Sequence, residues 1–262
     1  MTHITVVGSF AVGLTIRTDQ MPVFGQTILG SDFDFGPGGK GSNQAVGVAR
    51  LGGNATLVTC LGTDELAAVA DKLYAAEGVD TRYIERTDQR ATGAGIIILN
   101  AEARTILNPA PATKLPQEIF AHVDYLTPNE SELRILMGLA PDDPSSTRDL
   151  ALALRERGVG TVVVTLGGKG ALILSKDHDM VVPTRRVDVV DTTGAGDAFN
   201  AGFAVALGEG RAVEDAVAYG AACGAHACTR LGVIPSLATR AELEAAWTDV
   251  NMKSAKHKKG TR

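Results

Sequence analysis

The stretch VVDTTGAGDAFNAGFAVAL, residues 189–207, sets a carboxylate at the start of an apolar helix. Residues 198–207 are apolar almost all round, which predicts a buried helix. The first N–H groups of such a helix have no helical partners, and the helix dipole is positive there. Gly194 and Gly196 let the backbone curl so that several N–H groups converge, which predicts a phosphate or oxyanion cradle. Asp197 then lies where it can accept a proton from an attacking hydroxyl, whereas an ordinary helix cap is the alternative interpretation.

The composition fits one α/β domain that spans residues 1–262. The chain is 45% hydrophobic and carries a net charge of −5, which argues against a nucleic-acid partner. Its three cysteines have no metal-ligand spacing and fit buried thiols in a reducing compartment. We find no leader sequence and no long uncharged apolar run, so we expect a cytoplasmic protein without a membrane partner. Residues 252–262 are basic and predict a solvated, disordered tail.

Short β-rich runs alternate with helical patterns along most of the chain. ITVVGS and ATLVTCLG read as buried strands, and GSNQAVGVARLG and DELAAVADKLYAAEG read as helices that end at glycine. Later strands are predicted in HVDYLTPN, GTVVVTLGGKG and GALILS, and the last third is mainly helical. This alternation predicts a parallel sheet with helices on both faces.

Two regions break the alternation, at about residues 12–36 and 91–106. Both read as strands joined by polar turns, without helices between them. We interpret them as a small antiparallel β lid that projects from the core. Such a lid could close over a site or pair with a second copy of the chain, which predicts a homodimer.

The stretch GPGGKGSNQA contains a second glycine-rich turn. Gly36, Gly38 and Gly41 spell G-x-G-x-x-G, but the preceding run alternates apolar and polar residues, unlike the buried first strand of a dinucleotide fold. Gly41 also follows Lys40 where a P-loop needs Ser or Thr. A second interpretation is a turn on which a polar ligand lies, bonded by Lys40 and Asn43. A tight turn with a solvated lysine is the third.

Two further stretches lie where strands are expected to end. In TPNESE, Asn129 and Glu132 share one helix face and could touch a nucleotide phosphate and a hydrated Mg²⁺, although a capping box explains the spacing equally well. TLGGKGA follows a strongly apolar strand. A glycine turn at the carboxyl end of a parallel strand is a typical ligand site in open α/β sheets.

Taken together, GGKGSNQA, NESE, TLGGKG and DTTGAGDAF resemble the ribokinase-like sugar kinases of the PfkB carbohydrate kinase family. LNPAPATKLP and VDYLTPNE are similar to the ribokinase members of that family, and the matching stretches follow the family's order over nearly the whole chain. The resemblance implies a three-layer α/β/α fold with a mainly parallel central sheet and a small β lid. It implies ATP-dependent phosphorylation of a sugar or nucleoside.

The resemblance also implies roles for individual residues. Asp197 would be the general base that deprotonates the sugar's hydroxymethyl group. The backbone of Gly194, Ala195, Gly196 and Asp197 would form the anion hole. The implied sugar-binding residues are Gly39, Lys40, Asn43 and Asp197.

The remaining implied residues serve the nucleotide and the cations. The nucleotide would lie against Asn129, Thr165, Gly167 and Gly170. Glu132 would serve Mg²⁺. The implied monovalent-cation site, most simply for K⁺, consists of Asp191, Thr193, Arg230, Gly232 and Ser236.

The chain departs from this pattern in two places. Ala11 and Gly13 stand where the family has polar sugar ligands, so the sequence does not name the sugar. ILNAEARTILNPAPA also runs straight through where the family has a lid strand, a helix and a core strand, so one strand–helix unit is missing. A parallel strand needs a crossover of a dozen or more residues, and RTIL can be a lid strand or the start of a core strand, but not easily both.

Three functions are therefore weighed. The first is an active sugar kinase, which the intact GAGD stretch favours. The second is a shortened homologue that binds nucleotide or sugar without efficient turnover, which the missing unit favours. The third is a dinucleotide-dependent oxidoreductase, which rests only on the glycine spacing of residues 36–41.

Overall fold

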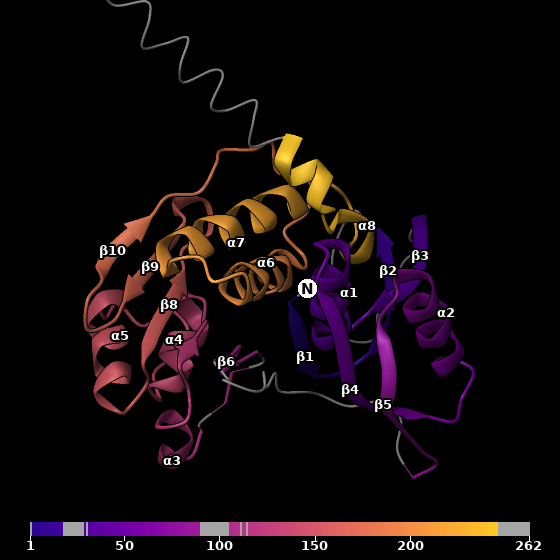
Figure 1. Cartoon of the computed structure of the whole chain (residues 1–262), viewed down its shortest axis with the longest axis horizontal. Coiled ribbons are helices and arrows are strands. Elements are labelled where there is room, and N and C mark those ends of the chain that lie inside the picture. The colour runs from indigo at the N-terminus through magenta and orange to yellow at the C-terminus, as the bar shows by residue number, and fades with distance from the viewer. Residues whose placement is uncertain are drawn as a thin grey trace, which may run out of the picture.

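The computed structural model describes residues 2–17, 29, 31–89, 105–110, 112–113 and 115–245. Its described strands lie in two sheets and a separate two-stranded ribbon (Figure 1). The fold is the predicted α/β type with helices packed on a mainly parallel sheet layer.

The first sheet has the order β1-β4-β5 and is parallel throughout. It consists of β1 (His3–Val7), β4 (Asn54–Gly62) and β5 (Asp80–Thr87). The crossovers are α1 (Lys40–Arg50), which follows the lid strands, and α2 (Ala67–Glu77). Ile4 and Val6 alternate inward along β1 and pack beneath α1 and α6. The sequence analysis did not identify β5, because its residues are mostly polar and exposed.

The second sheet has the order β10-β9-β8-β7-β6. It consists of β6 (Ile106–Leu107), β7 (Tyr125–Leu126), β8 (Thr161–Thr165), β9 (Ala171–Leu174) and β10 (Asp179–Val182). The first three strands are parallel, and β9 and β10 add in antiparallel fashion. A short 3-10 turn, η1 (Gly167–Lys169), joins β8 to β9.

Helices cover both faces of this second sheet. On one face lie α3 (Gln117–Phe120), α4 (Glu130–Leu136) and α5 (Thr147–Glu156), which enclose one hydrophobic cluster. On the other lie α6 (Ala195–Gly208) and α7 (Val213–Ala227), within the larger cluster that also includes the first sheet. The short α8 (Val233–Ser236) follows, and residues 240–245 are helical. In the described part of the chain, every helix is too short or too polar to span a bilayer.

The lid region at 12–36 contains β2 (Ala11–Arg17) and β3 (Ser31–Gly38), which pair in antiparallel fashion with Ala11 opposite Gly38. Most of the second predicted lid segment, residues 91–104, lies outside the described residues, as does the tail 252–262. The end of that segment differs from the lid interpretation. Ile106 belongs to β6 and pairs in parallel with Tyr125 of β7, so Ile106 and Leu107 form a core strand.

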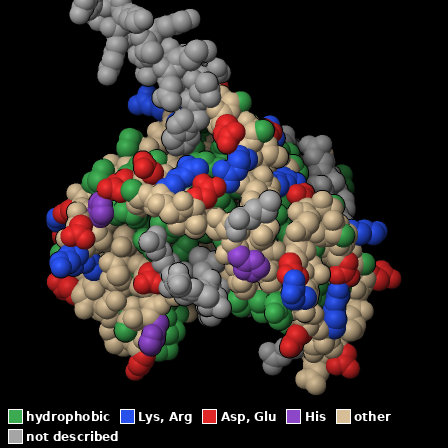
Figure 2. All heavy atoms as spheres, in the orientation of Figure 1, with side chains coloured by type: hydrophobic (Ala, Val, Ile, Leu, Met, Phe, Trp, Pro, Cys, Tyr) green, Lys and Arg blue, Asp and Glu red, His purple; other side chains and the backbone are tan. Residues whose placement is uncertain are grey.

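The sheet layer is interrupted between β1 and β6. Each is an end strand of its sheet, and no described strand pairs with the free edge of either. Figure 1 shows the two parts of the layer on either side of this interruption, and Figure 2 shows a notch in the molecular surface there. The interruption is the structural counterpart of the strand–helix unit that the sequence lacks. Helices α1, α6 and α7 hold the parts together, because residues of both sheets share their hydrophobic cluster.

Candidate active site

The first turn of α6 carries the amides that the sequence predicts to bind an anion. Gly194 is the N-cap residue with φ 80°, and a Cβ there would lie 2.4 Å from Val233 Cγ1. Only glycine tolerates both this positive φ and the lack of room for a Cβ atom. The Ala195 N–H donates to Thr192 O at 3.2 Å, so this amide of the predicted anion hole already has a carbonyl partner. Within the described chain, the N–H groups of Gly196 and Asp197 have none. Of the predicted anion-hole amides in the first turn of α6, those of Gly196 and Asp197 are therefore open and that of Ala195 is not.

The Asp197 carboxylate is buried next to the seat that these open amides form, with 5% of the residue exposed. Asn43 Nδ2 donates to Oδ2 at 2.7 Å, and Gln44 Nε2 lies 3.4 Å from Oδ1. Burial raises the pKa of Asp197 above its ordinary value, against the opposing effects of the Asn43 bond, the charge of Lys40 and the Gln44 bond. A buried carboxyl group whose pKa is raised is typical of a general base.

The glycines before α1 serve close packing. Gly39 has φ 96°, and a Cβ there would lie 2.6 Å from Ala11 N. A Cβ on Gly41 would lie 2.5 Å from Gly8 Cα, so the start of α1 touches the β1–β2 turn. This contact brings Asn43 to Asp197 and leaves Lys40 exposed. The sequence analysis did not identify Gln44, although it directly follows Asn43 in the same motif.

The two polar atoms of the Asn43 amide differ in their partners. Its Nδ2 donates to Asp197, whereas its Oδ1 is buried and accepts no hydrogen bond from any residue that the structure describes. A buried amide oxygen without a donor is costly, so a ligand hydroxyl that donates to it would be favoured.

A cavity of about 610 Å³ opens onto the first turn of α6. Residues from three of the predicted motifs line it, namely Asn129, Thr165, Gly167, Gly170, Ala195 and Gly196. A Cβ at Gly196 would meet no heavy atom within 4 Å, so the backbone there faces open space. The opposite wall is largely apolar, with Phe199, Ala221 and Val187 among its residues. The contributions of Ala221, from α7, and of Val187, from the segment before α6, were not predicted from the sequence.

Asn129 and Glu132 form the capping box of α4. Asn129 Oδ1 accepts from Glu132 N and Glu132 Oε2 accepts from Asn129 N, each at 2.8 Å. Burial raises the pKa of Glu132, and the nearby Asp197 charge adds to the rise, whereas the Asn129 bond and the Lys40 charge oppose it. The described residues contain no group of three or more His, Cys, Asp or Glu side chains placed to hold a metal ion. Glu132 Oε1 has no hydrogen-bond partner among them, which fits Mg²⁺ that keeps its waters and binds through one carboxylate and substrate phosphates.

The predicted monovalent-cation residues are partly brought together. Asp191 accepts from Thr193 N at 2.9 Å and from Gly232 N at 3.1 Å, and these bonds hold its pKa below the ordinary value. Both carboxylate oxygens thus join the loop before α6 to the loop before α8. Ser236 is buried and donates to Val233 O, and the Arg230 side chain turns away to Glu242.

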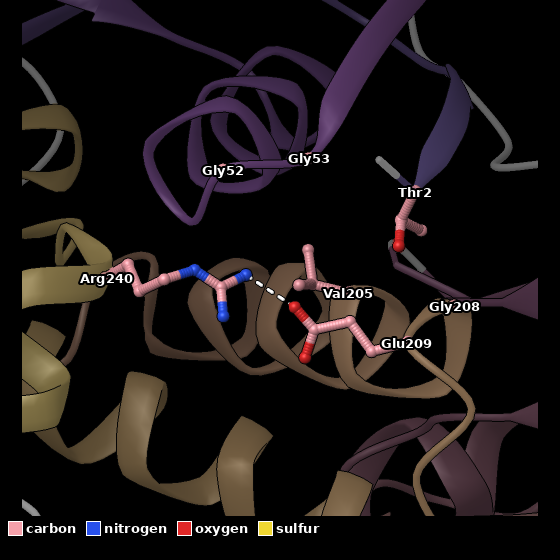
Figure 3. Close-up of a pocket in the computed structure, with 7 residues that line it drawn as sticks. All are labelled: Thr2, Gly52, Gly53, Val205, Gly208, Glu209 and Arg240. Carbon is pink, nitrogen blue, oxygen red and sulfur yellow. Dashed lines mark hydrogen bonds and ion pairs between the residues drawn. The ribbon is translucent and has the colours of Figure 1, made fainter.

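A second cavity, of about 570 Å³, lies at the opposite end of α6 (Figure 3). Its charged residues are already paired, because Arg240 donates to Glu209 at 2.6 Å and to Leu51 O at 2.7 Å. None of the predicted site residues lies there. The cavity at the start of α6 is therefore the candidate active site.

Comparison with known proteins agrees with this geometry. A sequence pattern described as pfkB family carbohydrate kinase matches residues 1–114 and 103–240. The chain belongs to this family. Membership makes the protein a phosphotransferase that acts on an alcohol group of a carbohydrate.

Several ribokinases are similar to this pfkB family member over nearly their whole length. Haemophilus influenzae ribokinase is 30% identical, over 91% of this chain and 96% of the relative. The crystal structure of Thermotoga maritima ribokinase superposes with a TM-score of 0.81 at 31% identity, over 94% of this chain and 99% of that one. Arabidopsis thaliana ribokinase, solved in complex with ribose and ATP, shares the fold with a TM-score of 0.78 at 24% identity, over 93% of this chain and 98% of that one.

The matches also locate the shortened middle. The alignment with the Haemophilus ribokinase runs over 294 positions, whereas 91% of this chain is about 238 residues, so about 56 positions of the relative have no counterpart. The two pieces of the family pattern meet at residues 103–114, which include β6. The interruption between β1 and β6 lies next to this junction.

Proposed function

We propose that the protein transfers the γ-phosphoryl group of ATP to the hydroxymethyl group of a sugar or sugar-like alcohol. One observation carries the proposal. The start of α6 offers two unpartnered amides beside a buried carboxylate, and Gly196 of this turn lines a cavity of about 610 Å³. A positive, preorganised seat with an adjacent base is what phosphoryl transfer requires.

In this proposal Asp197 is the general base. Its raised pKa makes it a better proton acceptor than an ordinary carboxylate, and Asn43 keeps it oriented. The amides of Gly196 and Asp197, next to Gly194 and Ala195, stabilise charge on the transferring phosphoryl. The buried Asn43 Oδ1 accepts from a sugar hydroxyl, and Lys40 and the backbone of Gly39 complete the sugar site.

The nucleotide occupies the cavity, with its phosphates toward Asn129 and the start of α6. Thr165, Gly167 and Gly170 line the same cavity, and its apolar wall suits a nucleobase. Glu132 would hold hydrated Mg²⁺, which supplies neutralising charge to the phosphates. Asp191, Thr193, Gly232, Ser236 and the Arg230 backbone would serve a monovalent cation such as K⁺.

The sugar itself is proposed only as a class, a pentose, a hexose or a nucleoside. Ala11, the first residue of β2, has no polar side chain, and Gly13 likewise offers none. A sugar that relies on hydrogen bonds at these positions would lose about 1–3 kcal/mol for each unpaired group.

A second candidate is a shortened homologue that binds nucleotide or sugar without efficient turnover. The interrupted sheet favours it, because β1 leads directly into the turn that packs against Gly41, two residues before Asn43. An unpaired edge strand gives that turn a less rigid support.

The deciding experiment is ADP release with MgATP across a panel of pentoses, hexoses and nucleosides, with and without K⁺. The Asp197→Asn variant is the control for contaminating kinases. Sugar-dependent ADP release by the wild type alone supports the kinase. Stabilisation by ATP without turnover on any acceptor would favour the binding homologue. Stabilisation by NADH and not by ATP would favour an oxidoreductase.

We also propose a homodimer joined through the β2–β3 lid, in the cytoplasm. Among the described residues, strands β2 and β3 pair only with each other, and a two-stranded ribbon gains stability when its edge or face is covered. Light scattering on the chain with and without residues 14–34 replaced by a short turn tests the dimer.

A further inference from the structure

A hydrogen-bonded pair connects the end of β7 to the first turn of α6. Thr127 and Asn200 are both buried, with 1% and 4% of each residue exposed. Thr127 Oγ1 donates to Asn200 Oδ1 at 2.7 Å, and Asn200 Nδ2 donates to Gly196 O at 2.8 Å. Neither Thr127 nor Asn200 belongs to the groups assigned above to base, anion seat or cation.

The chemistry of these bonds fixes the orientation of the Asn200 amide. A hydroxyl that donates to the amide oxygen leaves the NH₂ group facing the Gly196 carbonyl. The reverse orientation would place the amide oxygen against that carbonyl oxygen, which is repulsive. The pair thus holds Gly196 O by a second donor, in addition to the helical N–H of residue 200.

Holding Gly196 O also directs a catalytic amide. The Gly196 carbonyl and the Asp197 N–H belong to one planar peptide group and point in opposite directions. The Asp197 N–H is one of the two unpartnered amides of the seat. A bond to the carbonyl oxygen fixes the direction of that N–H and polarises the peptide, which makes the N–H a stronger donor.

The other end of the pair is firmly anchored. Thr127 N donates to Leu107 O at 3.0 Å, and Asn108 Nδ2 donates to Thr127 O at 3.1 Å. Thr127 also lies two residues before Asn129, and Asn129 lines the wall of the proposed nucleotide site. The pair therefore sets the distance between the α4 side and the α6 side of the cavity.

We infer that Thr127 and Asn200 are positioning residues for phosphoryl transfer, which act by aiming the Asp197 N–H at the transferring group. This inference rests on the proposed function. It predicts an effect on the transition state and little effect on the binding of either substrate, because neither side chain lines the cavity.

The test compares Thr127→Val, which keeps the shape and removes the hydroxyl, with Thr127→Ser, which keeps the hydroxyl. We expect Thr127→Val to lower kcat about 10-fold, with KM for ATP and sugar within about twofold of wild type. Thr127→Ser should retain wild-type kcat. Asn200→Leu is the second variant, because it leaves Thr127 bonded to Leu107 O and the helical bond to Gly196 O in place. It should match Thr127→Val.

The second readout is orthovanadate binding in the presence of MgADP, followed by thermal shift. Thr127→Val should lose vanadate-dependent stabilisation and keep ADP-dependent stabilisation. A fall in melting temperature with unchanged kcat in both Thr127→Val and Asn200→Leu would overturn the inference. If wild type turns over no acceptor, the proposed function fails, and the vanadate comparison decides the inference alone. Equal stabilisation by vanadate in wild type and all variants, or no stabilisation of wild type, then refutes the inference about Thr127 and Asn200.

Discussion

Replacing Asp197 with Asn should make the protein more stable while it lowers turnover by orders of magnitude. The carboxylate is 5% exposed and has one close donor, Asn43, and one distant donor, Gln44. A carboxylate has about four lone-pair positions, so the charge is buried with incomplete hydrogen bonding. Removing the charge relieves about 1–3 kcal/mol of desolvation penalty. In a chain of this size that corresponds to a rise in melting temperature of about 2–10 °C.

The pH dependence gives the sharper test. Because the folded-state pKa of Asp197 is raised, the folded protein binds this proton more tightly than the unfolded chain does. Wild type therefore loses stability as pH rises from the ordinary carboxyl pKa through the raised value, and Asp197→Asn does not. The difference should vanish at low pH and reach its full size at neutral pH. In wild type, the acidic limb of the kcat profile should likewise lie above the ordinary carboxyl pKa.

The assay combines thermal unfolding of both proteins at a series of pH values with ADP release at neutral pH. Turnover should fall by about 10²–10⁴-fold in the variant, with ATP-dependent stabilisation retained. A variant that is less stable than wild type at neutral pH, or a stability difference that ignores pH, would refute the reasoning about the buried charge. Retained turnover would remove Asp197 from the role of base.

Three further predictions follow from contacts. Gly196→Ala should fold with unchanged stability yet lower turnover, because its methyl group enters open space at the cavity. Gly194→Ala should instead lose about 1–3 kcal/mol of unfolding free energy, because of its positive φ and the contact with Val233. Equal unfolding free energies in the two variants would contradict this. Arg50→Met should destabilise the fold by about 1–3 kcal/mol, since Arg50 pairs with Glu77 and donates to the carbonyls of Ile234 and Leu237. An unchanged free energy of unfolding in denaturant would show that these bonds are unimportant. Hydrogen exchange should be faster in β1 than in β4, because β1 is an end strand, and matched protection would mean that something covers its free edge.

Local sequence patterns determined most of the elements and the backbone conformation of the turn that we propose to be catalytic. The apolar run after Asp197 is a buried helix, and Gly194 takes the left-handed conformation that its place at the helix start requires. These features depend on neighbours within one or two turns of the chain, so periodicity and glycine placement are sufficient to predict them. The missing strand–helix unit was visible in the same way, since too few residues separate two recognisable motifs.

Only the tertiary structure decided how the parts meet. It showed that the glycines before α1 allow close packing, that Asn43 and Gln44 turn their amides to Asp197, and that Ala195 N–H is already occupied. It also divided the sheet layer into two, and assigned Ile106 to a core strand. The amide contacts to Asp197 join residues more than 150 positions apart in the chain, and the packing of the glycines before α1 and the pairing of β6 join separate elements. Burial, hydrogen-bond partners and pKa shifts arise from such distant contacts, and no local pattern carries them.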